Sequence, residues 1–124
     1  MRKPLLACAL ALLAIPAEAA MLSRVGDPEV CSLLAGIGRE AAVMRQSGTS
    51  QQQAAQRLGA LIGDALSNGE GHLAARQDTA DLVGAEATGI LRLVYSMPVG
   101  RDDRQRAAAV AAAGAFIFDY CMGR

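Results

Sequence analysis

The chain has 124 residues, 52% of them hydrophobic, and its 12 basic and 12 acidic side chains give a formal net charge of +0. This length favours a single domain. A near-neutral chain of mixed charge lacks the basic surface that nucleic acids require, so we expect no nucleic-acid partner.

The first 19 residues have the order of a secretory signal peptide. Arg2 and Lys3 give a positive start, an apolar run follows over residues 5–15, and Ala17-Glu18-Ala19 places small residues where signal peptidase cleaves. The apolar run is shorter than the ~20 residues that span a bilayer, which favours a cleaved signal over an uncleaved anchor. A lipoprotein site at Cys8 is disfavoured, because most of the apolar run follows that cysteine.

We therefore predict a signal peptide over residues 1–19 and a single helical domain over residues 20–124. Such a chain would be periplasmic or secreted, with no membrane span after cleavage, and its 10 basic and 11 acidic residues would give a net charge of about −1. Two cysteines, Cys31 and Cys121, remain after cleavage. An even number in an oxidising compartment predicts a disulfide, with an intermolecular bridge or two free thiols as the alternatives.

The first two predicted helices have clear start and stop signals. Asp27-Pro28-Glu29 offers an N-cap side chain, a proline at the first helical position and a carboxylate in the first turn, and Ser47-Gly48 ends this helix. The second helix begins at Ser50 with Gln53 as a capping box, or one residue earlier at Thr49 with Gln52. It ends at Asn68-Gly69.

Two further helices follow residues 70–77, a stretch that is either a loop or an early helical turn. The third helix runs from Asp78 to Pro98, and the fourth begins around Arg101-Asp102-Asp103 and reaches Cys121. Eleven of the twelve residues from 107 to 118 are alanine, valine, isoleucine or phenylalanine. A helix that is apolar all round is buried at the centre of a fold or covered by a partner.

These segments predict an all-α fold, a small antiparallel four-helix bundle joined by short connections. In such a bundle the start of the first helix and the end of the last lie together, and Cys31 and Cys121 fall at those places. One disulfide linking the two helices would close a loop of roughly 90 residues and stabilise the fold by up to ~4.5 kcal/mol. Gly59-x-x-x-Gly63 and the alanine run are expected to pack within the bundle rather than form a dimer seam.

No catalytic or metal-binding group emerges from the sequence. His72 is the only histidine, and two distant cysteines lack the spacing of a zinc site, so we expect no metal and no cofactor. The carboxylate pairs Asp78/Asp81 and Asp102/Asp103 lie near helix starts, where the helix dipole already favours them. We therefore predict that the protein is not an enzyme and has no catalytic residues.

The aromatic residues of the last helix are the candidate binding residues. Together with Ile117, the residues Phe116, Phe118 and Tyr120 point around the full circumference of this helix, so three neighbouring helices cannot readily bury them all. Those that stay exposed would mark a partner surface, whereas core filling is the alternative. We predict an exported, non-enzymatic protein that binds an envelope protein or peptide through apolar helix surface. A carrier of small apolar ligands, with a cavity between its helices, is the second hypothesis, and an enzyme of unknown class is the third.

The chain also resembles a loose group of small exported proteins of Gram-negative bacteria. The shared features are an early cysteine, here Cys31, a Tyr-x-x-Pro break, here Tyr95-Ser96-Met97-Pro98, and a final helix that ends at a second cysteine, here Cys121. The resemblance implies a helical, two-cysteine design and no particular activity. The alanine-rich fourth helix departs from the more polar one of that group.

Overall fold

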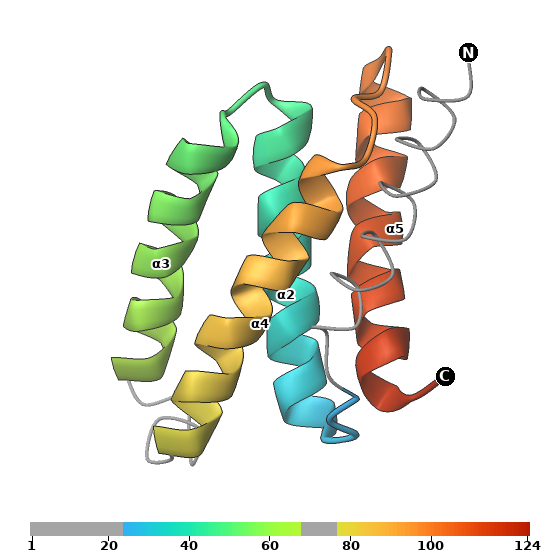
Figure 1. The fold of residues 1–124 in the computed structure, drawn as a ribbon. Coiled ribbons are helices and arrows are strands. Elements are labelled where there is room, and N and C mark those ends of the chain that lie inside the picture. The colour runs from blue at the N-terminus through green and yellow to red at the C-terminus, as the bar shows by residue number, and fades with distance from the viewer. Residues whose placement is uncertain (1–23, 68–76) are drawn as a thin grey trace, which may run out of the picture.

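The computed structural model describes residues 24–67 and 77–124, so the predicted signal peptide, His72 and most of the stretch 70–77 lie outside it. The described chain forms four helices, α2 (Pro28–Gln46), α3 (Gln51–Ser67), α4 (Gln77–Tyr95) and α5 (Asp103–Met122). They alternate in direction, as Figure 1 shows, and these two ranges contain no strand. The predicted all-α, antiparallel four-helix bundle is therefore confirmed.

The helix starts follow the predicted capping chemistry. The Oδ1 atom of Asp27 accepts hydrogen bonds from the backbone N–H groups of Glu29 at 2.9 Å and Val30 at 3.4 Å. Ser50 caps α3 through a 3.2 Å bond from the N–H of Gln53, which selects Ser50 over Thr49. Asp102, which was expected only as a carboxylate near the helix start, is the N-cap of α5 and accepts a 2.8 Å hydrogen bond from the N–H of Gln105. Each cap satisfies backbone donors that have no partner inside the helix.

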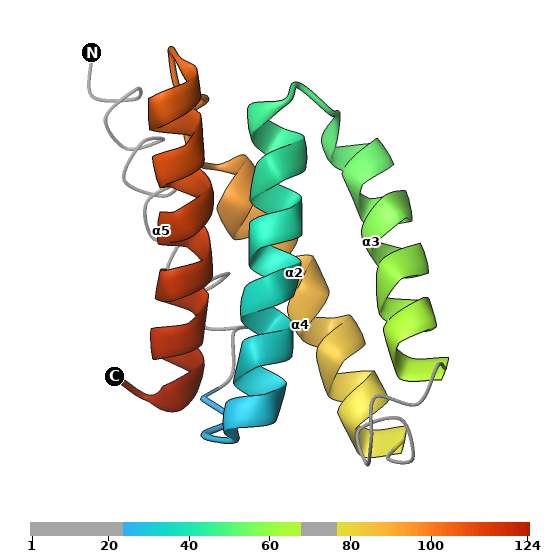
Figure 2. The same ribbon diagram turned by 180° about the vertical axis from the view of Figure 1, so that it is seen from behind.

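The helix α2 lies at the centre of the bundle and contacts the other three. Figures 1 and 2 show α3 and α5 at its two sides, with α4 crossing it. The core is made of long aliphatic side chains with small residues between them: Leu34, Ile37, Ala41, Leu58, Val83, Ile90, Val94 and Ile117. The alanine-rich α5 is thus an edge helix and not a central one. Alanine has little side-chain surface to bury, so more free energy is gained by enclosing the longer side chains of α2 and α4.

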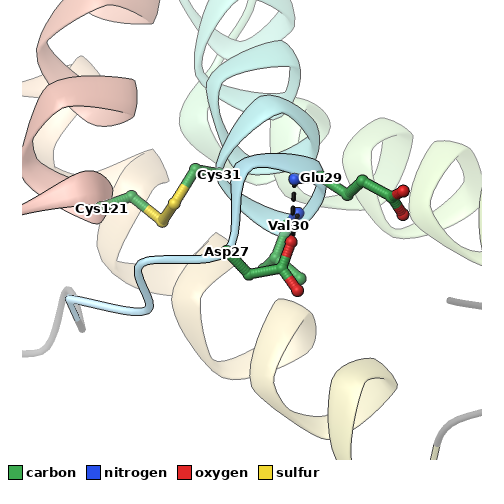
Figure 3. The surroundings of a disulfide bond; sticks show 5 residues. All are labelled: Asp27, Glu29, Val30, Cys31 and Cys121. Carbon is green, nitrogen blue, oxygen red and sulfur yellow. Dashed lines mark hydrogen bonds between the residues drawn. A yellow bond between two sulfur atoms is a disulfide. The ribbon is translucent and has the colours of Figure 1, made fainter.

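The disulfide joins α2 and α5 at one end of the bundle, which we call the disulfide pole (Figure 3). The Cα atoms of Cys31 and Cys121 lie 5.5 Å apart and both residues are buried. The backbone N–H of Gly26 also donates a 2.9 Å hydrogen bond to the carbonyl oxygen of Cys121. The predicted pairing is confirmed, and it ties the lead-in of the first helix to the last turn of α5.

At the opposite end, which we call the loop pole, a buried glutamine holds the α4–α5 loop against α2. Gln46 is 7% exposed. Its side-chain Nε2 donates to the carbonyl oxygen of Pro98 at 3.1 Å, and its Oε1 accepts from the backbone N–H of Gly100 at 2.7 Å. The guanidinium Nε of Arg45 donates to the carbonyl oxygen of Met97 at 3.1 Å. One helix end therefore supplies the hydrogen-bond partners of a loop that has few of its own.

Tyr95 fixes the neighbouring α2–α3 turn to the same pole. Its hydroxyl donates a 2.7 Å hydrogen bond to the carbonyl oxygen of Thr49, and the Arg45 guanidinium lies 5.5 Å from its ring centroid. Burial raises the pKa of the Tyr95 phenol, although the charges of Arg45 and Arg57 oppose this shift. The Tyr-x-x-Pro sequence noted above thus holds two loops in place, through the hydroxyl of Tyr95 and the carbonyl of Pro98.

Close approach between helices occurs at glycines other than the expected pair. A Cβ atom on Gly38 would meet the side chain of Ile117, and one on Gly114 would lie 2.7 Å from Cγ of Arg39. Gly59 and Gly63 are exposed, and a Cβ there would meet nothing within 4 Å. The prediction that this motif packs within the bundle is wrong, because α3 turns Ala54 and Leu58 toward the core instead. The tight contact is between α2 and α5.

Candidate interaction surface

An apolar, exposed strip of α5 extends over three turns, from the edge of its contact with α2 to the side that faces away from α2. The buried side of α5 consists of Ala113, Gly114, Ile117 and Cys121. The exposed side carries two rows of residues spaced four apart, and we call it the α5 outer face: Ala107, Ala108, Ala111, Ala112, Ala115 and Phe116. Residues four apart on a helix are neighbours, so the two rows form one continuous surface. The expectation that the whole alanine run packs inside the bundle is therefore wrong.

The three aromatic residues of α5 do not form a single patch. Phe116 is 52% exposed, whereas Phe118 and Tyr120 are half-buried. The rings of Phe116 and Tyr120 stack with centroids 6.2 Å apart, and the Arg24 guanidinium lies 5.3 Å from the Tyr120 centroid. The predicted partner residues therefore do not share one surface, and Phe116 is the most exposed of the three.

Phe118 points to the other side of α5, where it lines a surface groove between α2 and α5. The groove has a volume of about 490 Å³. Its charged lining residues are Arg39 and Asp119, both exposed. The Arg124 guanidinium lies 5.7 Å from the Phe118 ring centroid. An arginine over an aromatic face shields part of that ring from water, so Phe118 adds less apolar surface than Phe116.

Two further grooves flank α3. The groove between α3 and α4 has a volume of about 370 Å³ and is lined mainly by small residues: Ala55, Gly59, Gly63, Gly84, Ala87 and Thr88, with Leu58, Ile62 and Leu91. The groove between α2 and α3 has a volume of about 340 Å³, and its lining includes Leu33 and Leu61, the latter 49% exposed. Both reach the size of a small-ligand site. They are open to solvent, whereas the carrier hypothesis predicted an enclosed cavity.

The carboxylates near the described helix starts have local partners. Asp102 caps α5, and Asp103 pairs with Arg106 at 3.6 Å on the surface. Within residues 24–67 and 77–124, no group of three or more histidine, cysteine, aspartate or glutamate side chains could hold a metal ion. No helix of this described part is long and apolar enough to cross a membrane.

Sequence reasoning missed the sidedness of α5. A helical wheel of residues 103–122 places Ala108, Ala112 and Ala115 on the side away from Gly114 and Ile117, so the signal was present. It could not be used without knowing which side meets α2. Comparisons of the chain with protein-family models, with curated proteins and with solved structures find no match.

Proposed function

We propose that this protein is an exported, non-enzymatic interaction protein that binds another envelope protein, or a peptide, through the α5 outer face. The observation that carries the proposal is the exposure of Phe116 beside five exposed alanines on one helix side. Contiguous exposed apolar surface on a small protein marks a contact site. The buried disulfide suits an oxidising compartment, which supports export.

The shape of this face indicates the kind of partner. Alanine rows form a shallow surface that another helix can approach closely, because no long side chains keep the backbones apart. Phe116 projects from one edge of the rows, and exposed aromatic residues of this kind often contribute most of the binding free energy at an interface. The partner is therefore expected to present an apolar helix with a recess for one aromatic ring.

Site-specific photo-crosslinking in secreting cells tests the proposal. A photoreactive amino acid replaces Ala112 at the centre of the α5 outer face, and a matched variant carries it at Gln56, which is exposed on α3. We expect irradiation to join the Ala112 variant to a specific envelope protein or peptide, and to give no such product with the Gln56 variant. Adducts that are equal at both positions, or absent at both, would contradict the proposal.

A carrier of small apolar ligands is the second candidate function, and the groove between α3 and α4 favours it. Gly59, Gly63 and Gly84 leave open space there, where alanine would favour the helix by up to ~1 kcal/mol each. Native mass spectrometry of protein purified from a secreting host should then detect a bound apolar molecule. Replacing Gly59 with leucine should displace it, because the longer side chain would occupy the groove. Protein that carries no added mass at any stage of purification would argue against this function.

A further inference from the structure

We infer that the α5 outer face also binds the same face of a second copy, with the two α5 helices antiparallel about a twofold axis between Ala111 and Ala112. This inference goes beyond the proposed function, because it concerns self-association and specifies the register of the contact. It rests on the sizes and charges of the residues that such an axis would bring together.

A twofold axis at this point sets which residues face each other. Positions equally distant from the axis along the two helices become neighbours, and every contact occurs twice. Ala108 faces Ala115 of the second copy, and Arg104 faces Asp119. All four side chains are exposed in the single chain.

The facing residues at the centre of the contact are small. Alanines meet at the centre, so the helix axes can approach to ~8 Å, the short end of the usual range. Phe116 stays at the edge of this contact, because it lies ~180° around the helix from Ala107.

The facing residues are also complementary in charge. Arg104 is in the first turn of α5 and Asp119 is in the last, and each lies at the helix end where the helix dipole disfavours its charge. Among the described residues Arg104 forms no ion pair, and Asp119 has only an exposed contact with Arg124 at 3.6 Å. In the antiparallel pair, each arginine meets an aspartate and the C-terminal end of the other helix. The charges of Arg104 and Asp119, which lie at unfavourable helix ends in the single chain, would then each have a favourable neighbour.

The contact involves one helix from each copy, so it buries less than the ~1,600 Å² of a standard stable interface. We therefore expect a reversible dimer with a dissociation constant in the micromolar range. The grooves beside α3 lie on other helices, so they stay accessible in the dimer.

Sedimentation velocity of the full chain, exported and oxidised by a secreting host, tests the inference over a concentration series. The variants Arg104→Glu and Asp119→Arg each place like charges opposite one another twice, and each should weaken the dimer by about tenfold. Both changes improve the match to the helix dipole, so the variants should fold, which circular dichroism verifies. The control Arg57→Glu makes the same charge change on α3 and should leave dimerisation unchanged.

An equimolar mixture of the two α5 variants provides the sharpest measurement. In the mixed pair, the glutamate of the Arg104→Glu copy faces the arginine of the Asp119→Arg copy, and the unchanged Asp119 faces the unchanged Arg104. Each contact then joins one acidic and one basic residue, so the dimer should return to wild-type affinity. Wild-type protein that stays monomeric to ~1 mM would overturn the inference, because micromolar association would be complete there. A dimer that neither variant weakens, or a mixture that fails to recover, would overturn the antiparallel register.

The two proposals fail separately. Loss of the dimer with continued crosslinking of the Ala112 variant to another protein would overturn only the self-association. A dimer whose Ala112 crosslinks join nothing except a second copy would support the self-association and overturn the proposed function.

Discussion

Replacing Gln46 with leucine tests how much the loop pole contributes to stability. The glutamine makes two hydrogen bonds to the α4–α5 loop, one to the carbonyl oxygen of Pro98 and one from the N–H of Gly100. Leucine is similar in size but leaves both backbone groups without this partner, and each such loss costs about 1–3 kcal/mol when the group is shielded from water. We expect the unfolding free energy to fall by about 2–4 kcal/mol, a large share of the ~5–15 kcal/mol of a typical domain.

The variant Gln46→Glu separates the two hydrogen bonds. A glutamate can still accept from the N–H of Gly100, but it can donate to Pro98 only when it is protonated. Burial raises the pKa of the introduced carboxyl group, because the site disfavours its charge. The stability of this variant relative to wild type should therefore be highest below the ordinary glutamate pKa of ~4.3 and fall as the pH rises through the raised value.

Urea unfolding followed by far-ultraviolet circular dichroism at pH 4 and pH 7 measures both effects by linear extrapolation. The control Gln56→Leu makes the same change at an exposed position of α3 and should alter stability by less than ~0.5 kcal/mol. A Gln46→Leu variant within that same range of wild type would refute the role assigned to the glutamine. So would a Gln46→Glu variant whose difference from wild type is the same at both pH values.

The fold leads to three further predictions. Reduction of the disulfide should lower the unfolding free energy by up to ~4.5 kcal/mol, because the bonded residues are 90 apart in sequence. Denaturation with and without reductant measures this change. An unchanged denaturation midpoint with both thiols alkylated would contradict it. Gly59→Ala should raise the melting temperature and Gly38→Ala should lower it, because a new Cβ meets open space at the first position and Ile117 at the second. An equal decrease in melting temperature for both variants would contradict the packing described. In a Tyr120→Phe variant, the ultraviolet titration of Tyr95 should have its midpoint above pH 10 in the folded protein and near 10 in urea. The contribution of Tyr95 to stability is then constant below pH 10 and declines above it. Identical midpoints in the two states would contradict this.

The parts of the fold that depend on local chemistry could be predicted from the sequence. Asp27, Ser50 and Asp102 begin helices because each offers a side-chain acceptor to donors two or three residues ahead, and that chemistry needs no knowledge of the tertiary structure. The pairing of Cys31 with Cys121 was also predictable, because only two cysteines follow the predicted signal peptide and alternating helices bring their ends together.

Which side of each helix packs against its neighbours could not be predicted in the same way. Gly59 and Gly63 have the spacing of a packing motif, but α3 contacts its neighbours through Ala54 and Leu58. Gln46 resembles a solvated residue in the last turn of a helix, and it is buried because the loop after Pro98 folds over it. In both cases the outcome depends on which elements pack together, and intrinsic helix propensity carries no information about that.

The alanine run shows the same limit at the candidate site. Composition alone predicted that α5 would be covered on all sides, by the fold or by a partner. Packing against α2 covers only the side that contains Gly114 and Ile117. Which residues remain for a partner therefore depends on a single contact between helices, and the sequence does not state where that contact lies.

The hydrogen bond from Gly26 to Cys121 places the two ends of the described chain side by side. A short peptide could therefore join residue 124 to residue 24, with new termini opened at the exposed Gly48 turn between α2 and α3. In such a circular permutant the two cysteines would be separated by roughly 15 residues rather than 90, and the loop-closure contribution of the same bond would fall from ~4.5 to ~3 kcal/mol. Rearranging the order of the helices would thus reveal how much of the bond's effect comes from the length of chain that it encloses.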